Sequence, residues 1–87
     1  KRTNNLTGII EVNTQIIAIQ PNNFTAYLER GFAQKANGNC PSAISDFSKV
    51  IALNPQNSQA YNARGECREQ ANDAKNALKD YEKAVQL

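Results

Sequence analysis

The chain has 87 residues, a formal net charge of +2 and a composition that is 40% hydrophobic and 21% charged. A chain of this size forms one domain, and it contains no apolar run near the ~18 residues that a membrane-spanning helix needs. It has no histidine, the most common general base and metal ligand. Basic and acidic residues alternate over 55–87, with five of each, which favours a solvated helical surface over a nucleic-acid face. We therefore expect a soluble protein that is not an enzyme, without catalytic residues, metal or cofactor. No signal peptide is visible, so a cytoplasmic protein is expected rather than a secreted one.

The first predicted helix lies within residues 1–20. Its apolar residues recur on one face, as expected for an amphipathic helix, and Pro21 follows its end. Asn13 is the polar exception on this face. The apolar positions are Ile9, Ile10, Ile16, Ile17 and Ile19.

Four further helices are predicted, at about 24–37, 40–53, 58–71 and 74–87. Asn37-Gly38 is a helix stop, because both residues tolerate the left-handed conformation. Asn39 and Asp73 are predicted to cap the helices that follow them, and Ser58 is predicted to cap the helix at 58–71. Pro41 lies in a first helical turn, where its missing N–H costs little.

The chain repeats itself. The phrase that begins at Ala26 returns at Ala60, an interval of 60 − 26 = 34 residues. Sliding 21–53 along 55–87 gives ten identical pairs out of 33, which indicates a solenoid of repeated units. The identical pairs are Pro21/Pro55, Asn23/Asn57, Ala26/Ala60, Tyr27/Tyr61, Arg30/Arg64, Gly31/Gly65, Ala43/Ala77, Asp46/Asp80, Lys49/Lys83 and Leu53/Leu87.

The repeated residues describe a helix-pair interface. Gly31 and Gly65 lie inside predicted helices, where glycine costs ~1 kcal/mol relative to alanine. Close approach of a neighbouring helix would offset that cost, with a small residue facing the glycine and large residues on either side. The facing small residues are Ala43 and Ala77, and the large ones are Tyr27, Phe47, Tyr61 and Tyr81. We also predict an ion pair within each unit, Arg30 with Asp46 and Arg64 with Asp80.

This pattern resembles the tetratricopeptide repeat family, whose units have 34 residues. An aromatic residue, a glycine four residues later, a small residue, a second aromatic and a closing proline match at Tyr27, Gly31, Ala43, Phe47 and Pro55. The resemblance implies an all-α, right-handed solenoid of antiparallel helix pairs, with about two and a half units and five helices. The units would be a second helix of a degenerate leading unit at 1–20, unit one at 21–54 and unit two at 55–87.

The resemblance also implies a protein-interaction scaffold that binds a peptide or partner protein in a concave groove. The implied groove residues are Thr25, Leu28, Phe32, Lys35, Gln59, Asn62, Glu66 and Glu69. Leu28 and Phe32 beside an acidic, amide-rich second unit would suit a peptide with apolar and basic residues. The family's clamp for acidic chaperone peptides is not supported, because apolar residues occupy several of its positions.

Three alternatives stay open for this surface. The first helix of the leading unit, or a second copy of the chain, could cover the apolar line of Phe24, Leu28 and Phe32. Exposed solenoid ends would favour homo-oligomers. An RNA-binding helical repeat is the other alternative, although no nucleic acid is expected.

The two cysteines are far apart in the sequence. Cys67 is expected on the buried side of its helix, as a small core residue. Cys40 begins a second helix near the next unit, so a disulfide between Cys40 and Cys67 is geometrically conceivable and remains open.

Overall fold

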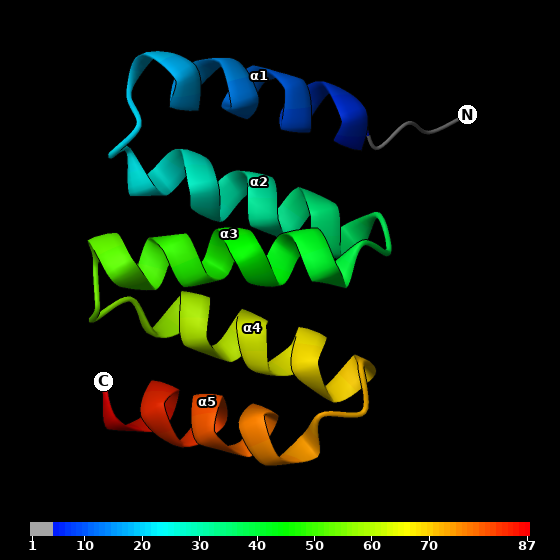
Figure 1. Cartoon of the computed structure of the whole chain (residues 1–87), viewed down its shortest axis with the longest axis vertical. Helices are drawn as coiled ribbons and strands as arrows, with labels where there is room; N and C mark the ends of the chain where they lie inside the picture. Colours follow the sequence, from blue (N-terminus) through cyan, green and yellow to red (C-terminus); the bar gives the residue numbers. More distant parts are fainter. Residues whose placement is uncertain (1–4) are drawn as a thin grey trace.

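The computed structural model describes residues 5–87, and residues 1–4 of the predicted leading segment lie outside the described part. Five antiparallel helices follow one another in a single stack (Figure 1). They are α1 (Leu6–Ile19), α2 (Phe24–Ala36), α3 (Cys40–Leu53), α4 (Ser58–Gln70) and α5 (Ala74–Gln86). The chain is thus the all-α, right-handed solenoid of helix pairs that the family resemblance implies.

Short polar side chains start four of the helices. Asn23, Asn39, Asn57 and Asp73 each accept a hydrogen bond from the backbone N–H three residues later, which satisfies one of the free donors of the first turn. The expected cap at Ser58 is wrong. Asn57 caps α4 through a 2.9 Å bond from Ala60 N to its Oδ1, and Ser58 is the first helical residue. Asparagine is preferred at this position because its carbonyl oxygen reaches the backbone donors of the first turn.

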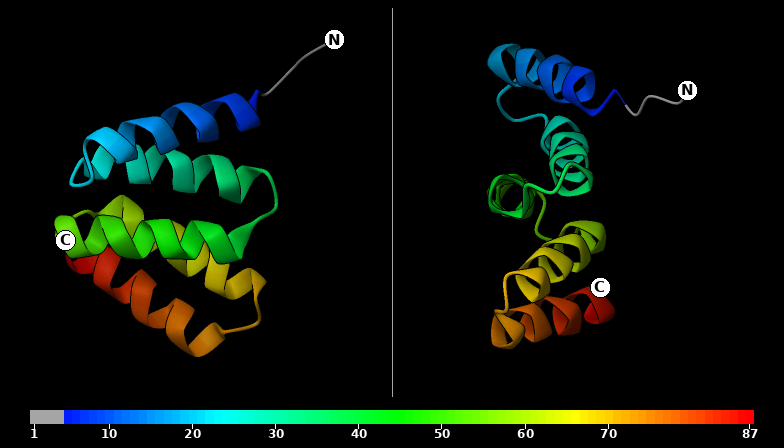
Figure 2. Two further views of the ribbon diagram at one scale, coloured as in Figure 1. Left: turned by 45° about the horizontal axis from the view of Figure 1, so that its top comes forward. Right: turned by 90° about the vertical axis from the view of Figure 1, so that its right-hand side faces the viewer.

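The core lies where α2, α3 and α4 meet. Phe47, Val50 and Ala43 of α3 are fully buried, and Ala60 and Cys67 of α4 pack against them. In the right-hand view of Figure 2, α3 lies on one side while α2 and α4 lie on the other. The second helix α3 is therefore covered both by its own first helix, α2, and by that of the next unit, α4.

The repeated glycines lie at the tightest of these contacts. A Cβ added at Gly31 would lie 2.7 Å from Cε1 of Phe47, and one at Gly65 would lie 2.9 Å from Cε1 of Tyr81. Only a residue without a side chain lets α2 approach α3, and α4 approach α5, this closely. The close approach stabilises the helix pair and offsets the poor helix propensity of glycine.

Both ion pairs expected from the sequence are present. Arg30 holds Asp46 with two bonds of 2.8 Å, from Nε to Oδ2 and from Nη2 to Oδ1. Arg64 holds Asp80 in the same way, at 3.0 and 2.8 Å. The carboxylates are buried, and hydrogen bonding to Asp46 raises the pKa of Arg30. These two-pronged contacts satisfy charges that would otherwise be buried without a partner.

Asn13 stands in α1 where the other second helices have an aromatic ring. It is buried, and its Nδ2 donates to the backbone oxygen of Ile9 at 3.0 Å. A buried amide is tolerated here because this local bond satisfies its donor. Within residues 5–87, no helix has both the length and the apolar character needed to cross a bilayer.

Candidate functional site

The eight predicted groove residues lie on the two first helices, α2 and α4. These helices are on the same side of the stack in Figure 2, so we call this surface the first-helix face. Thr25, Gln59, Asn62 and Glu69 are exposed, whereas Leu28, Lys35 and Glu66 are half-buried. The predicted residues therefore lie on two helices of the same side of the stack, but they do not line one continuous pocket.

Phe32 lies at the apolar part of this face. Its ring packs edge-on against Phe47, with 5.3 Å between ring centroids, and 39% of the residue is exposed. It borders a hollow of about 400 Å³ between α1 and α2. The lining residues are Leu6, Ile9, Glu29, Phe32 and Ala33. This hollow is almost entirely apolar, with one carboxylate at its edge.

Leu28 has a different environment from Phe32. It is half-buried and packs against the core cluster rather than lining the apolar hollow. The expected two-residue anchor is therefore divided, and Phe32 alone faces the hollow.

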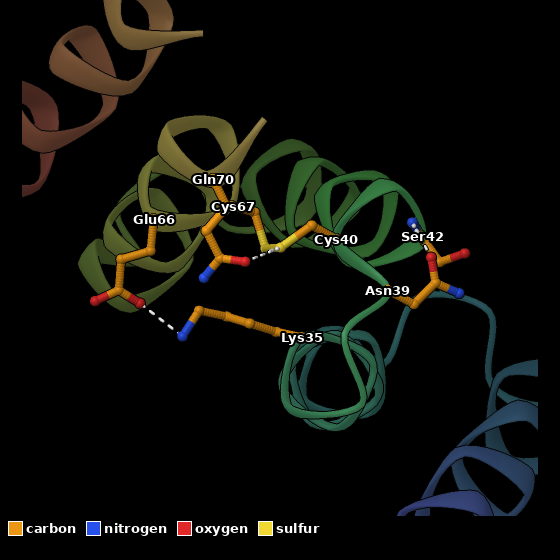
Figure 3. The surroundings of a disulfide bond; sticks show 7 residues. All are labelled: Lys35, Asn39, Cys40, Ser42, Glu66, Cys67 and Gln70. Carbon is orange, nitrogen blue, oxygen red and sulfur yellow. Dashed lines mark hydrogen bonds and ion pairs between the residues drawn. A yellow bond between two sulfur atoms is a disulfide. The ribbon is translucent and has the colours of Figure 1, made fainter. Parts of the chain in front are cut away.

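Two charged residues of the predicted groove neutralise each other. Lys35 Nζ on α2 lies 2.8 Å from Oε1 of Glu66 on α4, so the pair joins unit one to unit two (Figure 3). Glu66 is half-exposed, which limits the contribution of the pair to roughly 1 kcal/mol or less. A ligand with one charge at this point would have to displace an existing partner.

Glu69, Gln59 and Asn62 lie on α4, away from the hollow at Phe32. Tyr81 donates its hydroxyl hydrogen to Oε1 of Glu69 at 2.6 Å, which raises the pKa of Tyr81 to about 12. Gln59 and Asn62 border a hollow of about 500 Å³ between α4 and α5. Gln59 and Asn62 thus line a different hollow from the apolar one at Phe32.

Cys40 and Cys67 form a disulfide between the start of α3 and the last turns of α4, with their Cα atoms 5.3 Å apart. Cys67 is fully buried, as expected, but it is a bridged residue rather than only a small core residue. Gln70 Oε1 lies 3.4 Å from Cys40 Sγ (Figure 3). The disulfide fixes unit one against unit two beside the Lys35–Glu66 pair.

Sequence reasoning missed three contributors to these surfaces. Ile9 and Leu6 of α1 complete the hollow at Phe32, and Glu29 supplies its carboxylate. The apolar periodicity of α1 indicated a buried stripe, but not that part of the stripe stays open beside α2. No cluster of three or more potential metal ligands occurs in the described stretch, residues 5–87.

A family model described as tetratricopeptide repeat matches residues 47–86. Among solved structures, MamA superposes with a TM-score of 0.93 at 24% identity, covering 95% of this chain and 48% of the MamA chain. The first tetratricopeptide domain of Spaghetti (RPAP3), solved with the HSP90 peptide SRMEEVD, gives 0.86 at 28% identity, covering 88% of this chain and 61% of that one. A search of curated proteins found no match.

The chain spans about half the length of the MamA chain, and at that identity the likeness shows a shared fold alone. The family match covers the end of α3, α4 and α5, while the superpositions extend over nearly all of the chain. The chain therefore contains a tetratricopeptide repeat within the helical architecture typical of that family.

Proposed function

We propose that the chain is a protein-interaction module that binds a peptide segment on its first-helix face, with an apolar side chain of the peptide in the hollow at Phe32. The hollow carries the proposal because it is the most apolar opening on this face and Phe32 is half-open to solvent beside it. The RPAP3 domain, at 28% identity, was solved with a bound peptide, which supports a binding role for this fold.

The charge around the hollow favours a basic neighbour in the peptide. Glu29 borders this hollow and a second one of about 300 Å³ beside Ile9 and Val12. Among residues 5–87, no basic side chain forms an ion pair with Glu29, so none of these residues neutralises its carboxylate. An acidic peptide such as the one bound by RPAP3 would meet this carboxylate unfavourably. We therefore infer a partner with an apolar residue flanked by lysine or arginine.

The disulfide bears on the cellular compartment in which the protein works. Disulfides persist in oxidising compartments and are rare in the reducing cytoplasm. The Cys40–Cys67 bridge therefore supports an extracytoplasmic setting rather than the cytoplasmic one that the sequence suggested.

Fluorescence anisotropy tests the proposal with a short labelled peptide whose Leu-Phe centre is flanked by lysines. Loss of one buried aromatic contact corresponds to about 1.5–3 kcal/mol, so Phe32→Ala should weaken binding about tenfold or more. Glu29→Gln should weaken it a few-fold without changing stability, because Glu29 is exposed. Gln86→Ala, which changes an exposed side chain at the end of α5, is the control variant.

Three results would contradict this function. One is equal affinity of wild type and Phe32→Ala for the lysine-flanked peptide, with Phe32→Ala shown to be folded by circular dichroism. Another is tighter binding of the same peptide with glutamates in place of the lysines. The last is tighter binding of single-stranded RNA than of either peptide, which would favour an RNA-binding repeat.

A further inference from the structure

The outer face of α5 repeats the apolar surface of α3 on which α4 packs, but no described residue covers it. Ile44 and Ile51 of α3 are half-buried against the core. Their counterparts 34 residues later, Leu78 and Val85, are 57% and 86% exposed. The fifth helix therefore keeps the apolar stripe of the third without the helix that packs on it.

The two existing junctions share one polar contact in a fixed register. Arg30 Nη1 of α2 lies 3.1 Å from Thr14 Oγ1 of α1, and Arg64 Nη1 of α4 lies 3.1 Å from Ser48 Oγ of α3. Both contacts join a first helix to the second helix before it. The position is repeated once more in the sequence, because 48 + 34 = 82, and it holds Glu82.

Glu82 changes the chemistry of that contact. A hydroxyl only accepts a hydrogen bond from the arginine cation, whereas a carboxylate also pairs with it as an ion and binds it more strongly. Glu82 is exposed, and no ion pair to it forms within residues 5–87. The face of α5 thus combines an apolar stripe with a free anion at the point where the earlier junctions place an arginine.

The residues that a helix would need in order to pack on this face can be read from the helices already described. The fourth helix turns three small buried residues toward α3, namely Ala60, Ala63 and Cys67. These positions follow one another by three and four residues, and Arg64 comes directly after the second. A hollow of about 500 Å³ opens between α4 and α5, and Val85 is among its lining residues.

We propose that the outer face of α5 is a docking surface for one further helix of this type: small residues at the spacing of Ala60, Ala63 and Cys67, and an arginine that pairs with Glu82. Leu78 and Val85 would become partly buried under this helix, as Ile44 and Ile51 are against the core that α3 and α4 share. A second copy of the chain does not supply such a helix, because α2 and α4 are each already packed between two neighbours. The helix α1 packs only on α2, but it has no arginine that could pair with Glu82. The occupant is therefore the first helix of a further repeat unit. This inference does not depend on peptide binding at Phe32.

The test adds the helix to the protein. A copy of residues 54–70 is joined after Leu87, the counterpart of Leu53, with the copied cysteine replaced by alanine. Thermal unfolding by circular dichroism should shift upward by about 10 °C relative to the same extension with a scrambled sequence. Glu82→Arg should remove much of this shift in the extended protein, yet leave the melting temperature of the original chain unchanged. Changing the copy of Arg64 to glutamate together with Glu82→Arg should restore the shift.

Each contrary outcome is decisive. No upward shift relative to the scrambled extension would overturn the proposal, and so would a shift that Glu82→Arg leaves intact. Dimerisation of the original chain that Leu78→Glu abolishes, measured by sedimentation, would show that a second copy occupies the face. Phe32→Ala removes a ring that packs against Phe47, so it should lower the melting temperatures of the original and extended chains alike and leave the shift between them unchanged. Failure here is therefore distinguishable from failure of the peptide-binding function.

Discussion

The contact between Gly31 and Phe47 predicts that alanine, normally the better helix former, destabilises this protein at position 31. A Cβ there would lie 2.7, 3.0 and 3.1 Å from three atoms of the Phe47 ring. Favourable contacts between carbon atoms lie at about 3.5–4.0 Å. Phe47 is fully buried and packs against Phe32, so its ring has no free space into which to move.

Two opposing terms set the size of the effect. Replacing a helical glycine by alanine gains ~1 kcal/mol in helix propensity. Overpacking a well-filled core costs about 1–3 kcal/mol. Gly31→Ala should therefore lower the free energy of unfolding by up to roughly 2 kcal/mol, and the melting temperature by up to about 15 °C for a domain of this size.

Gly65→Ala is the matched control. Its Cβ would lie 2.9 and 3.0 Å from two atoms of the Tyr81 ring and 3.2 Å from the backbone oxygen of Ala77. Because Tyr81 is only half-buried, its ring can shift outward, and the cost should be smaller than at Gly31. Thermal and urea unfolding, followed by circular dichroism, measure both variants. The reasoning is refuted if Gly31→Ala stabilises the protein, or if Gly65→Ala is the more damaging change.

Two further predictions concern the disulfide and Tyr81. Reduction opens a loop between cysteines 27 positions apart, and loop-closure entropy predicts a loss of about 3.5 kcal/mol of stability. A thermal melt with reductant should therefore show a clearly lower midpoint. An unchanged midpoint, with two freely titrating thiols, would contradict the bridge. The hydrogen bond to Glu69 raises the pKa of Tyr81 from 10.0 to about 12. As pH rises, the tyrosine hydroxyl therefore loses its proton in the unfolded chain before it does so in the folded one. The stability that this hydrogen bond contributes is present below pH 10 and is lost as pH rises through about 12. Ultraviolet titration of the tyrosines should show a component near pH 12 that Glu69→Gln moves back toward 10; a titration that Glu69→Gln leaves unchanged would rule out this cause.

The repeat in the sequence determined most of the scaffold. Gly31 and Gly65, the small residues that face them and the Arg–Asp pairs recur at a fixed interval because each unit solves the same packing problem. Periodicity captures such contacts, since they lie within one unit and depend on residues a constant distance apart. Cap residues were predicted less well, because Asn57 and Ser58 are both good caps and only the backbone geometry selects one.

The tertiary structure decided how the surfaces are divided. Leu28 and Phe32 lie one turn apart on one helix, yet only Phe32 opens into a hollow, because α1 supplies the other wall. Lys35 meets Glu66, and Cys40 meets Cys67, only because α2, α3 and α4 cross at particular places. Each of these two contacts joins different units and occurs once, so the internal repeat of the sequence does not predict it. The sequence therefore specified what holds each unit together, and the packing of one unit on the next determined which surfaces remain free to bind.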